Sequence, residues 1–346
     1  MANKPIRFKK KKMTHRRKRK PIGRGLKALL LLMGLGVVAG VLWWSVQSIR
    51  RQLLEGRQVE VPIEAEYFGP GTGDGQFVEP WGIAIGPDQS VYVSDFGSGR
   101  VEKFNQEGRF LQTIGKKGGD KDLGPGSLNQ PSGLYVDPEG FLYVCDTFHH
   151  RVQKFDPSGK FVKDWSHAFF GPRGIAGDGH GRLYVVDTGN HRIEVFNRDG
   201  EFQEEWGAGG AGSEPDKFHE PVGVTVGPDG SVYIADSENR RIKKYSPDGK
   251  LRGIFGVETW MGKSAETPYL AASADGLYTT NASKNSVLRL DPNNGRIQAV
   301  YRKPGQPKEN GGFAYASGIA LDAQGRLWVV EKSVSKVSRF TPTRVK

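Results

Sequence analysis

The sequence predicts an all-β protein built from repeated four-stranded sheets, on three observations. One strand pattern recurs six times, and successive copies start 41 to 51 residues apart, which is the period of a four-stranded propeller blade. The 48 glycines and 20 prolines among 346 residues are too many turn formers for a mainly helical chain. The single cysteine, Cys145, excludes an intrachain disulfide framework and a cysteine-based zinc cluster.

The first 27 residues carry the excess positive charge. Thirteen of the 50 Lys and Arg residues lie there with no Asp or Glu, whereas the chain from Val59 onward has a net charge of −3. The formal net charge of +12 therefore belongs to this basic segment. The remainder lacks the positive field with which proteins bind phosphate backbones, which argues against nucleic acid as a partner.

An uncharged run, residues 28–49, follows the basic segment. As a helix it is long enough to cross the ~30 Å hydrocarbon core of a bilayer, and Trp43 and Trp44 near its end suit the headgroup layer. The charge asymmetry predicts a single-pass signal anchor with a cytoplasmic N-terminus, a basic segment against anionic lipid, and a periplasmic or extracellular remainder. A cleaved signal peptide is the alternative. Residues 50–58 are then interpreted as a linker and 59–346 as the repeat domain.

Each copy contains a five-residue strand core with an aromatic residue at its second position and a polar residue at its end. The six cores are VYVSD (91–95), LYVCD (142–146), LYVVD (183–187), VYIAD (232–236), LYTTN (277–281) and LWVVE (327–331). A strand that begins Pro-x-Gly precedes the core in the first four copies, and turns containing glycine separate the strands. Glycine suits such turns because it adopts left-handed backbone conformations without steric cost.

Charged pairs recur at a fixed interval. In four copies the terminal Asp is followed five residues later by Arg, so that a four-residue loop makes the two cross-strand neighbours, where opposite charges add ~0.2 to 1 kcal/mol. These pairs are Asp95–Arg100, Asp146–Arg151, Asp187–Arg192 and Asp236–Arg241, with Glu331–Lys336 in the sixth copy and the uncharged Asn281–Ser286 in the fifth. We interpret them as structural hairpin pairs, and ligand binding by these charges is the alternative.

The sixth copy stops after its third strand, at Phe340. The segment from Pro62 to Gly69 ends in Tyr67-Phe68-Gly69, which matches the ends of the fourth strands of other copies. We expect this N-terminal segment to form the outer strand of the last sheet, because it would close the ring and cover an open edge.

The combined pattern resembles the NHL-repeat family, most completely in DTGNHRIEVF (187–196) and DSENRRIKKY (236–245). The resemblance extends from Val59 to the end of the chain and implies a six-bladed β-propeller. The fifth copy departs from the pattern, since Leu270 replaces the glycine and the acidic partner is missing. The family indicates architecture more strongly than activity.

Enzymes of similar fold, including the peptidyl-hydroxyglycine amidating lyase and lactonase-type propellers, hold a metal in the central channel with His or acidic residues of the innermost strands. Here those strands are expected at 81–85, 132–136, 173–177, 222–226, 269–273 and 317–321, and they contain no His, Asp or Glu. We therefore expect no metal at this place and no cofactor. His219 and Glu79, beside inner strands, are the remaining ligand candidates. A metal-dependent lyase or lactonase stays an alternative function, and an RNA-binding propeller a second one.

Variable loops on one face of the expected disc favour binding as the leading function, because loops on a rigid scaffold are common binding sites. Six residues combine expected exposure with aromatic or polar character and are candidate contacts. They are Trp81, Phe148, His149, Arg173, Asn190 and Trp260. The sequence thus predicts a membrane-tethered, extracytoplasmic, non-catalytic module that binds or senses a protein, peptide or glycan. It leaves the oligomeric state open.

Overall fold

The computed structural model describes residues 43–45, 56–207, 209–260, 268–307 and 310–343. It divides the chain into two units, 1–51 and 52–346. Of the first unit only Trp43, Trp44 and Ser45 are described, and they are helical. No helix among the described residues is long and apolar enough to cross a membrane. The basic segment and nearly all of the span predicted at 28–49 lie outside the described residues.

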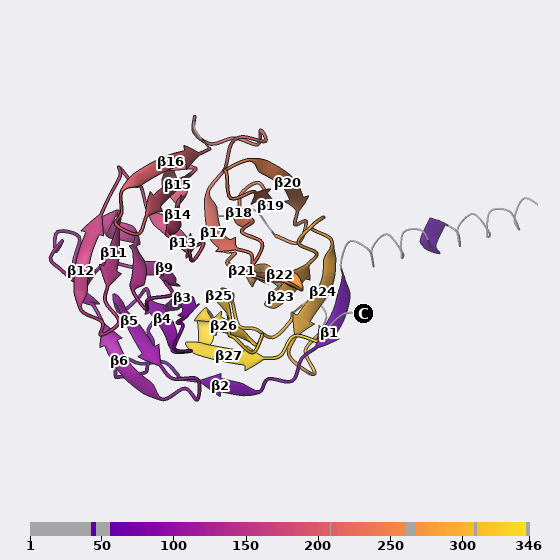
Figure 1. The fold of residues 1–346 in the computed structure, drawn as a ribbon. Coiled ribbons are helices and arrows are strands. Elements are labelled where there is room, and N and C mark those ends of the chain that lie inside the picture. Colours follow the sequence, from indigo (N-terminus) through magenta and orange to yellow (C-terminus); the bar gives the residue numbers. More distant parts are fainter. Residues whose placement is uncertain (1–42, 46–55, 208, 261–267, 308–309, 344–346) are drawn as a thin grey trace, which may run out of the picture. The chain divides into compact units, whose positions relative to one another are not determined.

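The second unit is a ring of six sheets, the blades, whose innermost strands surround a common axis (Figure 1). Strands run antiparallel from the innermost to the outermost position in each blade. Blades 1 to 3 are β3 (Pro80–Ile85), β4 (Val91–Asp95), β5 (Arg100–Phe104), β6 (Phe110–Ile114); β9 (Pro131–Val136), β10 (Leu142–Asp146), β11 (Arg151–Phe155), β12 (Phe161–Trp165); and β13 (Pro172–Gly177), β14 (Arg182–Asp187), β15 (Arg192–Asn197), β16 (Phe202–Trp206).

Blades 4 to 6 repeat this order. They are β17 (Pro221–Val226), β18 (Val232–Asp236), β19 (Arg241–Tyr245), β20 (Leu251–Gly256); β21 (Leu270–Ser273), β22 (Gly276–Asn281), β23 (Ser286–Leu290), β24 (Ile297–Arg302); and β25 (Ala316–Leu321), β26 (Leu327–Glu331), β27 (Lys336–Phe340), β2 (Ala65–Tyr67). A small two-stranded sheet of β7 (Lys116–Lys117) and β8 (Ser127–Leu128) lies in the loop between blades 1 and 2. The six-bladed all-β propeller expected from the repeats is confirmed.

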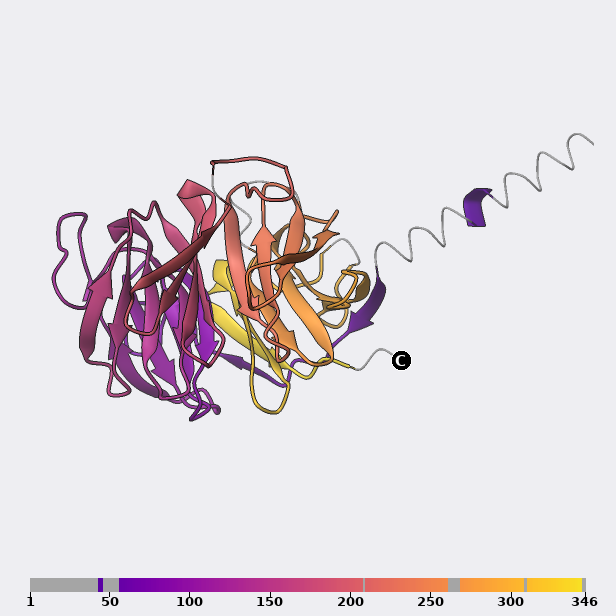
Figure 2. The ribbon, with the colours of Figure 1, turned by 45° about the horizontal axis from the view of Figure 1, so that its top comes forward.

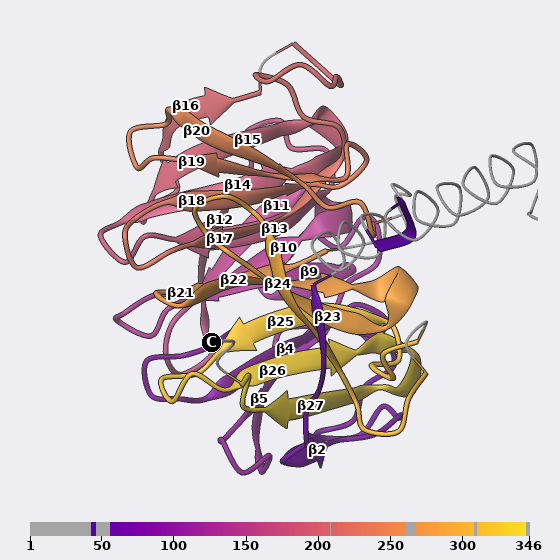
Figure 3. The ribbon, with the colours of Figure 1, turned by 90° about the vertical axis from the view of Figure 1, so that its right-hand side faces the viewer.

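Apolar side chains fill the spaces between neighbouring blades, which face one another like stacked sheets in Figure 3. Each of the six interfaces has its own buried cluster, made from strands of both partners and, in most clusters, from fourth-strand or loop residues such as Ile114, Trp206 and Phe218. The aromatic residue of every strand core is at most 3% exposed, and Trp328 is fully buried. Cys145 lies in the cluster between blades 2 and 3 as a small buried side chain. The alternation of the strand cores therefore reflects inter-blade packing.

The N-terminal segment closes the ring as predicted. β2 pairs antiparallel with β27, with Tyr67 opposite Val337. The Tyr67 ring stacks on Trp328 with centroids 5.3 Å apart, and Phe68 lies 3.8 Å from Phe104 of blade 1. Blade 6 thus gains its outer strand and its aromatic contact to blade 1 from the start of the domain.

A second strand precedes this closure and was not foreseen. β1 (Arg57–Glu60) pairs in parallel with β24, placing Val59 opposite Tyr301 at the outer edge of blade 5 (Figures 1 and 2). It begins within the segment that the sequence led us to interpret as a linker. The chain is therefore fastened to two neighbouring blades before it enters blade 1.

In blade 5 the residue that replaces the glycine of Pro-x-Gly lies one position before the predicted Leu270. Leu270 pairs with Thr279, as Ile83 pairs with Val93 in blade 1, so Leu270 occupies the aliphatic position and not the glycine position. Tyr269 is the residue that replaces the glycine. The expectation for Leu270 was wrong because the fifth inner strand lacks the glycine that sets the register in the sequence.

Candidate functional site

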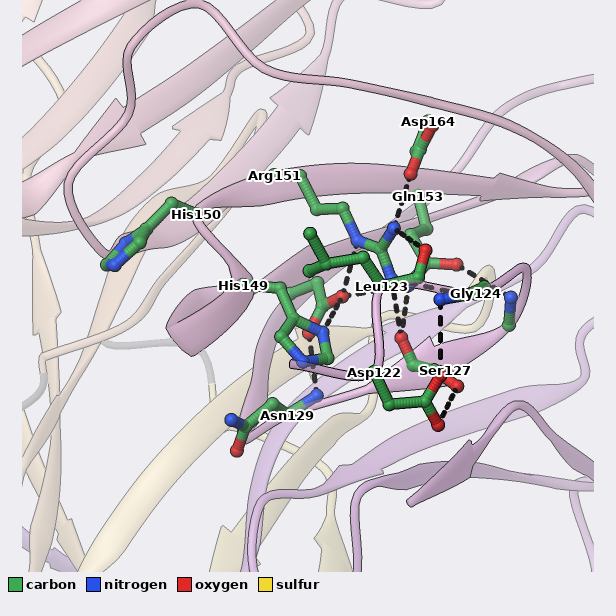
Figure 4. Close-up of polar contacts among 12 residues, drawn as sticks. Asp122, Leu123, Gly124, Ser127, Asn129, His149, His150, Arg151, Gln153 and Asp164 are labelled. Atoms are coloured by element: carbon green, nitrogen blue, oxygen red, sulfur yellow. Dashed lines mark hydrogen bonds and ion pairs between the residues drawn. The ribbon is translucent and has the colours of Figure 1, made fainter. Parts of the chain in front are cut away.

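In five of the six blades, a buried carboxylate at the end of the second strand fastens the loop that leads into the same blade, and blade 5 has Asn281 at this position. In blade 2 the Asp146 carboxylate accepts hydrogen bonds from the Asn129 amide at 2.7 Å and from His149 Nδ1, Arg151 Nε and Gln153 Nε2, each at 2.8 Å (Figure 4). Four donors on a carboxylate with no exposed side-chain surface make this a rigid joint.

Arg151 extends this joint to the loop between blades 1 and 2. Its guanidinium donates to the carbonyls of Leu123 and Ser127, each at 2.8 Å, and pairs with Asp164 at 2.5 Å (Figure 4). His149 Nε2 lies 2.9 Å from the Gly119 carbonyl of the same loop. His149 is therefore a buried fastening residue, and its predicted exposure was wrong.

The same joint recurs in blades 3 and 4. Asn190 donates to Asp187 at 2.7 Å and to the Ala168 carbonyl at 2.9 Å, as Asn239 does to Asp236 and the Gly212 carbonyl. Arg192 pairs with Asp187 at 2.9 Å and Arg241 with Asp236 at 2.6 Å. The residue three positions after the Asp is thus a structural side chain, which explains Asn190 without a ligand.

The hairpin pairs of blades 1 and 6 have different charge partners. Asp95 and Arg100 are cross-strand neighbours, but Arg100 Nε pairs with Glu102 at 2.7 Å, while Asp95 accepts the Val78 and Glu79 amides. Glu331 and Lys336 are also neighbours in the ladder. Glu331 pairs with Lys303 at 2.7 Å, whereas Lys336 pairs with Glu66 at 3.2 Å. The predicted registers are confirmed, and the predicted ion pairs hold in blades 2, 3 and 4.

In blades 2 and 3, the histidine that follows the fastening side chain links its blade to the next one. His150 has a left-handed backbone (φ 54°), and its Nδ1 accepts the Gly171 amide at 2.9 Å. His191 accepts the Glu220 amide at 3.1 Å in the same way. These histidines join consecutive blades, which accounts for the His before Arg in the repeat.

Two buried charged residues on third strands, Glu194 and Lys243, have shifted pKa values. Burial raises the pKa of Glu194 to about 7, although Arg192 and His167 contact its carboxylate. Burial also lowers the pKa of Lys243 to about 8, although Asp236 lies 4.0 Å away. Lys243 Nζ donates to the Pro215 carbonyl at 2.9 Å. The two groups stand at the same position of the repeat but are of opposite charge type. The partners of this buried position therefore differ from blade to blade.

Tyr269 lies at the start of the inner strand of blade 5 and bonds to blade 3. Gly82 and Gly174 pack so closely on the next inner strand that an added Cβ would lie 2.2 Å from a carbonyl oxygen. At the equivalent position of blade 5, the Tyr269 hydroxyl reaches across the axis and donates to the Arg173 carbonyl of blade 3 at 3.0 Å. Tyr269 is buried, and this burial raises the pKa of its hydroxyl. Tyr269 therefore links the inner strands of blades 5 and 3.

The inner strands all begin on one face of the ring. We call the loop and strand-end residues there the channel mouth: they are 78–81, 96–97, 147–148, 170–173 and 332. Trp81 lies there but is only 8% exposed, because Phe96 packs on its ring at 4.1 Å and Lys332 Nζ lies 3.9 Å from its centroid. Trp260 is 2% exposed and belongs to the core between blades 4 and 5. The exposure expected of these two tryptophans was wrong.

Two phenylalanines at the channel mouth are exposed. Phe148 is 51% exposed and Phe170 61% exposed. Phe148 follows Thr147, whose hydroxyl donates to the Pro172 carbonyl at 2.9 Å, and Phe170 stacks on the His150 ring at 5.4 Å. Phe148 was predicted as a contact, whereas Phe170 was missed. The sequence feature that could have revealed Phe170 is its position, two residues before Pro172 at the start of an inner strand.

The candidate metal ligands have other partners. The Glu79 carboxylate pairs with Lys332 at 2.7 Å, and the His219 ring packs edge-on against His191 with centroids 5.6 Å apart. Within the described ranges, no group of three or more His, Cys, Asp or Glu residues could hold a metal ion.

A cavity of about 1000 Å³ lies on the opposite face, among the turns between first and second strands. Asp137, Asp322 and Arg289 line it. Asp322 is already held by Arg326 and the Trp328 indole, and Asp137 by the Tyr143 hydroxyl. These two carboxylates therefore already have hydrogen-bond partners within the protein.

Comparisons with known proteins agree with this geometry. The NHL repeat model matches residues 77–104, 128–155, 169–196 and 218–245. Peptidyl-glycine alpha-amidating monooxygenase of Mus musculus is 29% identical over 146 residues, which cover 40% of this chain and 15% of the relative. NHL repeat-containing protein 3 of Homo sapiens is 30% identical over 118 residues, covering 28% of this chain and 33% of the relative. The chain thus spans a small part of these relatives.

Solved structures show the same fold at low identity. A virginiamycin B lyase from Staphylococcus aureus with quinupristin has a TM-score of 0.56 at 20% identity, covering 79% of this chain and 83% of the other. A protein from Bacteroides thetaiotaomicron has a TM-score of 0.59 at 18% identity, covering 80% and 76%. The chain carries four matched NHL repeats within a six-bladed β-propeller.

Proposed function

We propose that the propeller is a non-catalytic binding scaffold and that its partner, a protein, peptide or glycan, docks on the channel mouth. The observation that supports this most is the pair Phe148 and Phe170, two large apolar rings that are more than half exposed on the same face of the propeller. Burying such a ring against a partner contributes about 1.5 to 3 kcal/mol. Aromatic anchors on rigid supports are the usual source of binding energy at interfaces.

The rigidity of the supports strengthens the proposal. Phe148 stands between Asp146 and His149, which are both buried and hydrogen-bonded to each other at 2.8 Å. The Phe170 amide donates to Asp187 at 2.7 Å. Because both rings are held before binding, little conformational entropy is lost on association.

A double substitution tests this function. Phe148→Ser with Phe170→Ser removes both anchors, while Leu111→Ser with Val162→Ser removes two exposed apolar side chains of similar exposure from the outer strands β6 and β12. Affinity capture with the full-length chain from its source cells is expected to lose its specific partner in the first variant and keep it in the second. A partner retained by the first variant and lost by the second would contradict the proposal.

We further propose that residues 28–49 tether this scaffold to a membrane, with the propeller on the extracytoplasmic side. The support is the uncharged run and the thirteen positive residues before it. Protease added to intact cells, or to spheroplasts where the cells have an outer membrane, is expected to degrade the propeller while sparing an N-terminal tag. Protection of the propeller would reject this topology.

An enzymatic role is the second candidate, favoured by similarity to an amidating monooxygenase over 146 residues. It would be a metal-dependent lyase or lactonase with ligands from loops. Metal analysis of the purified chain, with hydroxyglycine peptides and lactones as substrates, discriminates the two. Stoichiometric metal with turnover would replace the binding proposal.

A further inference from the structure

The repeat places Arg173 at the channel mouth, because equivalent residues of other blades lie there. It is the second residue of inner strand β13, as Trp81 is of β3 and Ser132 is of β9. In blades 1 and 2 this side chain contacts the residue just after the terminal Asp of its own blade: Trp81 packs on Phe96, and the Ser132 hydroxyl lies 2.7 Å from that of Thr147. Arg173 therefore occupies the equivalent position on the rim of the ring.

Arg173 differs from the other arginines of the described residues in its environment. The remaining half-buried arginines have carboxylate or carbonyl partners, as Arg192 and Arg241 show. Arg173 is half-buried, yet its guanidinium makes no hydrogen bond or ion pair in the described part of the chain. Partial burial of an unpaired charge is unfavourable, and an incoming anion would offset that cost.

The surroundings leave this charge available. Lys332, another cation of the channel mouth, already pairs with Glu79 at 2.7 Å. The Tyr269 hydroxyl bonds to the backbone carbonyl of Arg173 and leaves the guanidinium unbonded. A ligand group at Arg173 therefore meets a cation that has no hydrogen-bond or ion-pair partner in the described part of the chain.

The partly buried Phe96 and the exposed Phe148 and Phe170 belong to the rim of three consecutive blades. Phe96 and Phe148 have centroids 6.4 Å apart and belong to blades 1 and 2, and Phe170 lies three residues before Arg173 at the start of blade 3. An extended chain lying along this arc would place alternate side chains on the same face, about 6.6 Å apart. The arc thus suits a segment that passes over the mouth.

We propose that Arg173 binds the carboxylate of an acidic side chain in an extended segment of a partner protein, whose flanking apolar residues pack on Phe148 and Phe170. This rests on the binding function proposed above and names the chemistry of the partner. The planar guanidinium takes a carboxylate in a two-point geometry, which adds specificity as well as affinity.

A random 12-residue peptide library displayed on phage tests the proposal with the purified full-length chain. Because display blocks the C-terminus of each peptide, an enriched carboxylate is a side chain. We expect the wild type to enrich peptides with one Asp or Glu among apolar residues, and Arg173→Lys to keep part of this preference. Arg173→Gln is expected to bind the enriched peptides about 10- to 100-fold more weakly.

Arg109→Gln is the matched control, because Arg109 is exposed in the turn between β5 and β6 on the opposite face. It should bind like the wild type, and Arg173→Gln should keep the wild-type Tm since the guanidinium makes no hydrogen bond or ion pair with any described residue. Synthetic versions of one enriched peptide separate the sources of the carboxylate. One version replaces the acidic residue with Gln and has a free C-terminal carboxylate. It should bind more weakly than the peptide with the acidic residue, and equal or tighter binding would overturn the assignment to a side chain.

The failures of the two proposals are distinguishable. Peptides without acidic residues that bind the wild type, yet lose binding to the Phe148→Ser, Phe170→Ser variant, would overturn the role of Arg173 alone. Enriched peptides that bind this double variant as well as the wild type would overturn both proposals. A selection that enriches nothing on the wild type would also overturn both.

Discussion

The buried joint at Asp146 predicts a large and non-additive loss of stability when its charge is removed. Asp146→Asn keeps the shape of the side chain but removes the charge that four donors share. It leaves Arg151 buried, with Asp164 as its carboxylate partner. Breaking one side of a buried ion pair costs about 3 to 5 kcal/mol, so the variant is expected to lose that much unfolding free energy.

Blade 5 indicates a second substitution that should recover part of the stability lost in Asp146→Asn. Its equivalent residues, Asn281 and Ser286, are buried, paired in the ladder and uncharged. Asp146→Asn combined with Arg151→Ser copies this arrangement into blade 2. The double variant should be less destabilised than the sum of the single ones, by about 2 kcal/mol or more, because the stranded cation is gone.

Urea denaturation followed by tryptophan fluorescence measures the four unfolding free energies of this cycle. Asp199→Asn, at an exposed turn residue, serves as the control and should change stability by no more than about 0.5 kcal/mol. Single losses that add to the double loss within about 0.5 kcal/mol would refute the view that Asp146 and Arg151 form one buried unit.

Three further changes have expected outcomes. Tyr67→Ala removes the ring stacked on Trp328 and should cost up to about 3 kcal/mol, seen as a lower Tm; an unchanged Tm would show that β2 does not close the ring. Lys243 has a folded-state pKa of about 8, below its ordinary value of 10.5, so the folded chain releases this proton first and unfolding free energy should rise between pH 8 and 10. Lys243→Met should lack that rise, and identical pH profiles would reject the assignment. Tyr269→Phe removes the hydrogen bond to the Arg173 carbonyl and should lower unfolding free energy by about 1 kcal/mol, whereas no change would mean that the hydroxyl is not bonded there.

Local periodic signals predicted the fold because each blade is built from contacts close in sequence. The strand cores, the glycine turns and the terminal Asp set the hairpins, and their register is as expected in blades 1 to 4. Ring closure by β2 followed from a missing fourth strand. β1 was missed because a parallel pairing between Val59 and Tyr301 involves no turn that a sequence could reveal.

The candidate site was predicted less well because exposure depends on residues distant in sequence. Trp81 is covered by Lys332, 251 positions away, and His149 is bonded to the Gly119 carbonyl of a preceding loop. Phe148 and Arg173 remain at the rim, and Phe170 joins them only when blades 2 and 3 are placed side by side. Side-chain type indicated what could bind, but the packing decided what is accessible.

Hydrogen–deuterium exchange of the full-length chain, with and without a bound partner or an enriched peptide, tests the channel mouth most directly. Binding there should slow exchange in 146–150 and 168–173 and leave the turns at 86–89 and 322–325 unchanged. Protection confined to those turns, which line the cavity on the other face, or to the outer strands would contradict a docking site at the channel mouth.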